Sequence, residues 1–459
     1  MDAKNQVDQE WRDGEKTQSL SGGHDAGLLG DKLAVFTFMK SHSSSGMLPR
    51  VAFLLVPLLI ISGGSHLFAA KKKAAKPVEV APQQITHFHL DDPHTKAGFE
   101  YFYNAEYDPA IKEFDIALQA HPDDPFAVNH LLTGVMFKEM YRIGALDSEL
   151  YAKEGFLHSK QFPIDPKIRE QVNQLSARAL QLEDERLKKN PNDVDALYSR
   201  GATRGLKSTW MALIDKAWFS ALRSVVGARH DDERVLELDP NYSDAKMVVG
   251  MHNYVIGSVP WAVKVAASIV GLSGSREKGI QLLYECANAG GEASVDAKIA
   301  LALFLRREQR YKEAIQIVDG LSASYPKNFL MALELANLYN ASGNGPEAIA
   351  TYHKLLKASD AGFFPPGAHV EMAWYGLGEA LRGQRNMGDA EVAYSRVQDF
   401  PKADPDLKLR ATLGEGEMFD AMQKRSDAVK CYQAVLAADE SDSPRAELAR
   451  KHLKQPFRM

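Results

Sequence analysis

The sequence predicts an all-α protein made of repeated helix pairs, and two observations carry this prediction. Between Gly98 and Pro122, small and aromatic residues follow one another at helical spacing, and a proline closes the stretch. Farther along the chain, four alanines recur in a similar context at intervals of 34, 42 and 38 residues, namely Ala314, Ala348, Ala390 and Ala428. A pair of short helices cannot bury its apolar face alone, so we expect these units to stack into one solenoid.

The first unit shows why this spacing suits two crossing helices. Gly98 and Ala110 are small at the positions where the helices would cross, so the two backbones can approach closely. We expect Tyr101 and Phe114 to fill the seam between the helices. Pro122 is expected just after the second helix, because proline cannot continue it.

The order Gly-x2-Tyr, Ala-x3-Phe and Pro resembles the signature of the tetratricopeptide repeat family, whose helix–turn–helix unit spans about 34 residues. The resemblance is strong over residues 94–125 and 294–438, and weak over residues 126–290, where we expect longer and less regular helices. It implies a tetratricopeptide-type solenoid, a right-handed superhelix with an irregular helical middle section. An insertion at Ala361–Pro366 accounts for the longest interval between the alanines.

The chain is expected to divide into a leader, an apolar segment, a linker and the repeat array. The predicted parts are a disordered leader at residues 1–46, a signal peptide or membrane anchor at 47–70, a linker at 71–93, a first repeat at 94–125, a divergent helical region at 126–290, C-terminal tetratricopeptide repeats at 291–440, and a capping helix with a tail at 441–459. The capping helix is predicted to begin at Ser443-Pro444, a favourable cap and first-turn pair, and its charged residues suit the polar end of an array.

Two interpretations of residues 47–70 place the array on different sides of a membrane. If the chain starts at Met47, a short basic start, an apolar run from Val51 to Ile61 and a small-residue end near Ala69 have the layout of a secretory signal peptide. If it starts at Met1, the long polar leader favours a retained anchor, although a spanning helix needs about 20 residues. A buried core helix is the third possibility. We expect an exported or membrane-anchored protein.

The composition gives no reason to expect nucleic acid as a partner or a catalytic reaction. The net charge is only −5 over 459 residues, whereas nucleic-acid binders carry a basic face. Cys286 and Cys431 lie far apart, match no metal spacing and are expected to be small buried hydrophobes. No nucleophile-elbow, zinc-protease or paired-cysteine motif is present. We therefore expect a protein that is not an enzyme and binds no cofactor.

Three histidines beside two aspartates form the strongest candidate for a metal site. His87 and His89 would share a face of an extended strand, and His94 follows closely. The alternative is that this segment simply joins the linker to the first repeat, with Asp92 or Thr95 starting the helix. A second charged run, His230–Glu233, is expected to form a loop.

The resemblance also implies where a partner binds. In the family, the first helix of each repeat faces the concave surface of the superhelix, and this places eight residues in the groove: Phe99, Phe102, Arg306, Asn337, Asn340, Tyr375, Glu379 and Arg382. Such a mixed apolar and polar lining suits a peptide or a helix. Thr95 and Phe99 stand where chaperone-tail binders of this family carry Lys and Asn, so that clamp is not expected.

We therefore expect a non-catalytic scaffold that binds a protein or peptide in its groove. The alternative is a membrane-associated protein whose middle region binds lipid or an apolar ligand. That alternative depends on Val259–Leu272, an apolar stretch that carries only Lys264 as a charge.

Overall fold

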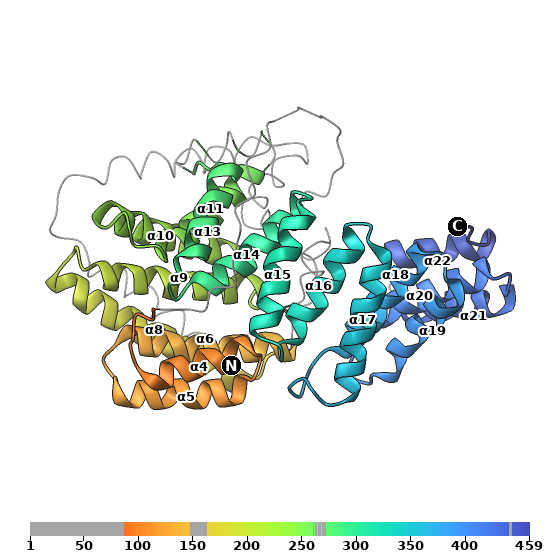
Figure 1. The fold of residues 1–459 in the computed structure, drawn as a ribbon, viewed down its shortest axis with the longest axis horizontal. Coiled ribbons are helices and arrows are strands. Elements are labelled where there is room, and N and C mark those ends of the chain that lie inside the picture. Colours follow the sequence, from red (N-terminus) through yellow and green to blue (C-terminus); the bar gives the residue numbers. More distant parts are fainter. Residues whose placement is uncertain are drawn as a thin grey trace, which may run out of the picture.

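The computed structural model describes residues 87–146, 163–259, 272–439 and 443–459, together with Trp261, Lys264 and Ser268. Within these residues the fold consists of 17 α-helices and one 3-10 turn (Figure 1). This confirms the predicted all-α class. The predicted leader and the predicted signal peptide or anchor lie outside the described residues.

The helices follow one another as pairs, and each pair packs on the next. The first five pairs are α4 (Pro93–Tyr103) with α5 (Tyr107–Ala120), α6 (Pro125–Arg142) with α8 (Pro166–Lys189), α9 (Val194–Leu213) with α10 (Trp218–Leu238), α11 (Ala245–Ser258) with α13 (Arg276–Ala289), and α14 (Ser294–Arg307) with α15 (Tyr311–Ser324). The next three are α16 (Phe329–Ala341) with α17 (Gly345–Asp360), α18 (Val370–Gly383) with α19 (Met387–Arg396), and α20 (Pro405–Ala421) with α21 (Arg425–Ala438). The 3-10 turn Val397–Asp399 follows α19, and α22 (Pro444–Lys454) closes the array.

The close approach of paired helices depends on small residues that lie under aromatic rings. A Cβ atom on Gly98 would lie 2.4 Å from the ring of Phe114, and one on Gly378 would lie 2.7 Å from the ring of Tyr394. These distances are far below van der Waals contact, so only glycine fits at either position. The predicted role of Gly98 at the crossing is confirmed. The prediction for Tyr101 is wrong: this ring is 37% exposed, because the neighbouring aromatic residues of α4 turn inward in its place.

The turns inside the repeats share a backbone conformation that the sequence does not reveal. One residue in each of five turns has a φ between +58° and +80° and lies five positions before the buried alanine of its unit: Ala105, Gln309, Gly343, Arg385 and Gln423. This left-handed conformation usually favours glycine, yet only one of the five is glycine. The turn is therefore imposed by the packing of the two helices rather than by local sequence preference.

The divergent middle region continues the same stack, and its helices α8, α9 and α10 span 24, 20 and 21 residues, which makes them longer than the helices of the later repeats. One detail of the prediction is wrong. The run His230–Glu233, expected to be a loop, lies within α10, where the Asp231 carboxylate is 2.7 Å from the Arg200 guanidinium.

The array curves until the turn between α15 and α16 meets the end of α4. The Asn328 side chain donates a hydrogen bond to the Tyr103 carbonyl at 2.8 Å, and Lys327 Nζ lies 2.8 Å from Glu106 Oε1. The Tyr103 hydroxyl donates to Asp296 in α14 at 3.1 Å. The first five helix pairs therefore form a closed turn, and the pairs from α16 onward extend away from it as an arm (Figure 1).

Residues 87–92, which the sequence assigns to the linker, pack within this closed turn. Phe88 and Leu90 are buried. The backbone N–H of His87 donates to the Gly290 carbonyl at 3.3 Å, and that of His89 donates to a Glu292 carboxylate oxygen at 3.0 Å. The end of the predicted linker is thus part of the folded core.

A buried polar network joins three helices of the middle region. Glu183 of α8 accepts hydrogen bonds from Ser199 at 2.8 Å and from Thr203 at 2.7 Å, both on α9, and the Thr203 hydroxyl oxygen lies 2.8 Å from Asn129 Oδ1 of α6. Burial raises the pKa of Glu183 to about 7, despite these hydrogen bonds. A carboxyl group with a raised pKa takes up a proton on folding, so it contributes stability that is present at low pH and lost as the pH rises.

We predict that replacing Glu183 with Gln reduces the pH dependence of stability. Between pH 6 and pH 8 the wild-type protein should lose roughly 1 kcal/mol through this single group, because the interval spans its folded-state pKa. Glu183→Gln cannot titrate, so its free energy of unfolding should change less over the same interval. Urea unfolding at the two pH values measures the difference. An unchanged pH dependence would show that Glu183 is ionised throughout.

We predict that Ala390→Leu destabilises the arm by roughly 1–3 kcal/mol, because the extra methylenes overpack a well-filled helix crossing. Ala390 is completely buried in α19. Val392→Leu on the same helix is the matched control, since Val392 is 53% exposed, and its effect should stay within about 0.5 kcal/mol. Equal stabilities of the two variants in urea unfolding would contradict the packing argument.

Candidate functional site

The arm has an inner face formed by the first helix of each pair. α16 contacts α18, α18 contacts α20, and α20 contacts α22 across the intervening helices. The second helices, α17, α19 and α21, make no comparable contacts with one another in the described part of the chain. Helices that touch their counterparts lie on the inside of a curve, so we call the surface of α16, α18 and α20 the concave face.

An aromatic and a cationic side chain meet at the centre of this face. The Arg410 guanidinium of α20 lies 4.8 Å from the ring centre of Tyr375 of α18, which is cation–π distance. The Tyr375 ring lies 5.8 Å from that of Tyr394, and the Tyr394 hydroxyl donates to Glu379. Burial and the charge of Glu379 raise the pKa of both tyrosines, that of Tyr375 to about 12. Both hydroxyl groups therefore remain protonated hydrogen-bond donors at neutral pH.

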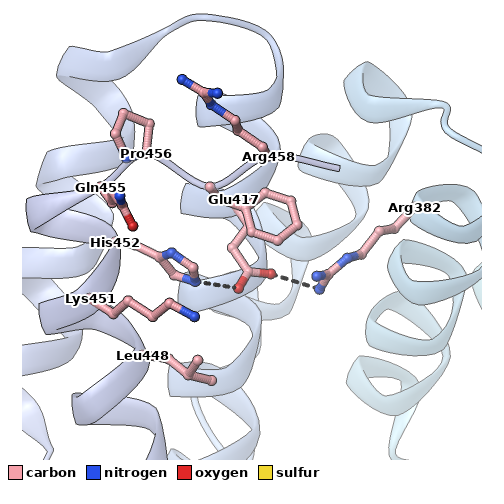
Figure 2. A pocket seen from close by; sticks show the side chains of 9 residues that line it. Arg382, Glu417, Leu448, Lys451, His452, Gln455, Pro456 and Arg458 are labelled. Carbon is pink, nitrogen blue, oxygen red and sulfur yellow. Dashed lines mark ion pairs between the residues drawn. The ribbon is translucent and has the colours of Figure 1, made fainter.

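Next to this centre, a buried carboxylate lies between two basic side chains (Figure 2). Glu417 of α20 is 2.7 Å from the Arg382 guanidinium of α18 and 3.2 Å from His452 Nε2 of α22. Burial, opposed by the charge of Arg382, raises the pKa of Glu417 to about 7. Burial and the nearby Lys451 lower the pKa of His452. The pair Arg382–Glu417 links two neighbouring repeats across the concave face.

The C-terminal tail folds back onto the concave face after α22 ends. The Phe457 backbone N–H donates to Asp420 at 2.8 Å, and the Arg382 guanidinium lies 5.1 Å from the centre of the Phe457 ring. Arg425 donates to the carbonyls of His452 and Leu453 at 2.8 and 2.7 Å. The tail thus forms one wall of the face.

Between α18, α20, α22 and this tail lies a hollow of about 430 Å³. The C-terminal hollow, as we name it, is lined by nine residues: Arg382, Glu417, Leu448, Lys451, His452, Gln455, Pro456, Phe457 and Arg458. In Figure 2 the Glu417 carboxylate lies between Arg382 and His452, with the Lys451 side chain beside His452. Acidic and basic groups share this lining.

The structure does not bring the eight predicted groove residues together. Phe99 and Phe102 are 5% and 6% exposed inside the closed turn, so neither offers a surface to a partner in this conformation. Arg306 lies on α14, where its guanidinium is 3.0 Å from Glu334. The other five, Asn337, Asn340, Tyr375, Glu379 and Arg382, all lie on α16 and α18 and are partly exposed.

Several residues of the concave face were missed by the sequence analysis. Arg410 lies seven residues, or about two helical turns, before Glu417, so extending the groove pattern toward the start of α20 could have found it. Lys451, Phe457 and Arg458 lie in the capping helix and tail, for which the repeat pattern has no counterpart. Their place on the face depends on how the tail folds back.

Two of the three histidines of the predicted metal site, His89 and His94, take separate partners. His89 Nε2 is 2.9 Å from Asp244, and Tyr242 is hydrogen-bonded to the other ring nitrogen at 3.1 Å. His94 instead contacts Glu113 at 2.7 Å. Burial lowers the pKa of His89, but the hydrogen bond to Asp244 and the charges of Glu292, Asp244 and Asp195 together hold it above its usual value. Among the described residues, no cluster of three or more potential ligands could hold a metal ion.

The sequence and structure were compared with known proteins. Residues 299–363 and 333–406 match the family model described as tetratricopeptide repeat. No curated protein sequence matches the chain. None of the helices in the described part of the chain is both long and apolar enough to span a bilayer.

Solved structures resemble the chain at low identity. Yeast Tom70 is 12% identical, with 79% of this chain and 87% of that chain covered and a TM-score of 0.37. A human IFIT1 dimer with m7Gppp-AAAA is 12% identical, with 80% and 84% covered and a TM-score of 0.39. A tetratricopeptide repeat protein from Parabacteroides merdae is 13% identical, with 70% and 97% covered and a TM-score of 0.31.

The evidence for the family comes from the repeats themselves. The family model matches two overlapping segments that contain α16 to α19, and the same pairing of helices over buried small residues recurs before and after them. The chain contains tetratricopeptide repeats, which the family model places within residues 299–406.

Proposed function

We propose that this chain is a non-catalytic scaffold that holds a peptide or protein segment against the concave face of its arm. Tetratricopeptide repeats generally mediate protein–protein interaction. The observation that supports this site is the cluster around Tyr375, in which partly exposed aromatic, amide and charged groups lie on one face of adjacent helices. An extended segment or a helix can use such a face through both apolar contacts and hydrogen bonds.

The closed turn supports the choice of the arm. Its inner aromatic residues are buried against the chain itself, and residues 87–92 pack against its inner helices. In the described part of the chain, the inner residues Asn340 and Tyr375 of the arm keep part of their surface exposed. The concave face of the arm therefore offers a partner an accessible surface.

The choice of variants follows from the ion pairs. Removing Arg382 would leave Glu417, which is only 5% exposed, with His452 as its remaining partner, and stranding a buried charge is strongly destabilising. Arg410 can be removed more safely, because its partner Asp406 is also paired with Arg445. Arg410 is therefore the better position to test.

We predict that the double variant Tyr375→Ala, Arg410→Ser loses the proteins that wild-type chain retains from an extract of its source cells. The reason is that both side chains form the centre of the concave face. Quantitative mass spectrometry of the retained proteins measures the loss, and circular dichroism checks that helicity stays near wild type.

The control is Lys354→Ser with Val392→Ala, which changes exposed positions on the outer helices α17 and α19. This variant should retain the same proteins. If both double variants retain the partners equally, the concave face is not the binding surface.

We further propose that the protein is exported or membrane-tethered through residues 47–70, which lie outside the described residues. The support is the sequence layout alone: a basic start at Met47, an apolar run and a small-residue end. We expect mass spectrometry of the mature protein to find an N-terminus near Ala70 if the segment is a cleaved signal. An N-terminus at Met1 or Met47 would indicate a retained anchor, and release of the full-length chain from membranes without detergent would contradict both.

The second candidate function is binding of lipid or an apolar ligand by the middle region. One observation favours it: Phe219 is 67% exposed and Trp261 is 75% exposed. Most residues around Trp261 lie outside the described part of the chain. Flotation of a chain lacking residues 1–76 with liposomes would favour this function over the scaffold.

A further inference from the structure

We propose that the C-terminal hollow receives an acidic side chain of the partner segment, and this inference rests on the proposed scaffold function. The hollow lies at the end of the concave face, beyond Tyr375 and Arg410. A segment that follows the face toward α22 therefore reaches it. Its walls come from α18, α20, α22 and the tail, so it exists only where the array ends (Figure 2).

The charges of the hollow favour an anion. Three of its lining side chains are permanent cations, Arg382, Lys451 and Arg458, and a single carboxylate, that of Glu417, opposes them. Glu417 is paired with Arg382 at 2.7 Å. The side chains of Lys451 and Arg458 take part in no ion pair or hydrogen bond within the described residues, and both are exposed. The hollow thus carries two cations that nothing in the described chain neutralises.

A hydrogen-bond network holds the backbone at the base of the hollow. Arg425 bonds to two carbonyls at the end of α22, and it also pairs with Asp420 at 2.9 Å. Asp420 in turn accepts from the Phe457 backbone N–H and from the Tyr432 hydroxyl at 2.9 Å. This network fixes the direction in which the chain leaves α22. It therefore fixes the backbone of the tail that carries Arg458.

A simpler role for Lys451 is compensation of the helix dipole, because cations stabilise the last turn of a helix. Lys454 supplies a control for that role. It lies in the same last turn of α22 and is exposed, but it does not line the hollow. If the helix dipole is the reason, changes of Lys451 and of Lys454 should have similar effects. If an anion binds in the hollow, its binding should depend on Lys451 and not on Lys454.

The probe is a fluorescently labelled decapeptide of alternating Glu and Gly with blocked termini, and its counterpart has Lys in place of Glu. Fluorescence anisotropy with the full chain measures the dissociation constant at low and at physiological salt. We expect the Glu peptide to bind and the Lys peptide not to bind. Binding should weaken as salt is raised, because exposed charges are screened.

We expect Lys451→Glu and Arg458→Glu each to weaken binding of the Glu peptide at least fivefold, while Lys454→Glu changes it less than twofold. Equal effects of Lys451→Glu and Lys454→Glu would overturn the inference, as would the absence of Glu-peptide binding to the wild-type chain. A single-stranded oligonucleotide of equal charge that binds as tightly would also overturn it, because the attraction would then be unspecific. Unfolding in urea confirms that each variant is folded.

The two proposals can fail separately. If Tyr375→Ala, Arg410→Ser loses the natural partners while Lys451→Glu behaves as Lys454→Glu does, the concave face stands and the acidic contact is refuted. If the Glu peptide binds through Lys451 but the concave-face variant keeps its partners, the hollow is an anion site and the scaffold proposal fails at that face.

Discussion

The structure depends on the distance between paired helices, which is set where a residue without a side chain lies beneath an aromatic ring. At Gly98 and Gly378 the ring of the partner helix occupies the space that a Cβ atom would need. Any larger residue would push the two helices apart. Because each pair is the surface on which the next pair packs, an error at one crossing would change the curvature of all later units. The closed turn and the concave face both follow from that curvature.

The closed turn and the arm divide the molecule into two parts with different surfaces. In the turn, the first helix pair contacts the fifth and sixth, and acidic and aromatic side chains meet around Tyr103 and His89. In the closed turn, contacts from the chain itself therefore cover the inner face. The arm curves without meeting its own start, so its inner face keeps polar and aromatic groups available. The loop before α18 adds a link between the two parts, since His369 contacts the Tyr141 carbonyl at 2.8 Å.

The sequence predicted the helix pairs and the helix cap, which depend on neighbouring residues. It did not predict the contacts between units, which depend on how the array curves. The helix pairs, the buried alanines and the Ser443 cap of α22 follow from spacing and cap chemistry over fewer than forty residues, and all are present. Phe99 and Phe102 follow the same groove pattern as Tyr375, yet they are buried, because Phe88 and His130 pack against Phe99 and Phe137 packs against Phe102. The repeat pattern does not report these contacts, since Phe88 precedes the first unit and the other two rings belong to the next helix pair. The contacts of the tail that carries Phe457 were not predicted, because the tail follows the last helix and its sequence has no periodicity.

The pairing of charges along the concave face limits what a partner can gain from it. Arg382, Arg410 and Arg425 each have an acidic partner from their own or an adjacent helix, and Glu379 accepts from Tyr394. Displacing Arg382 or Arg425 would leave a buried carboxylate behind, that of Glu417 or Asp420, so a partner benefits little from these charges. Electrostatic complementarity governs orientation and association rate more than affinity. Under our proposal, the two unneutralised cations at one end of the face would therefore fix the direction of the bound segment, while apolar contacts and hydrogen bonds near Tyr375 would supply most of its affinity.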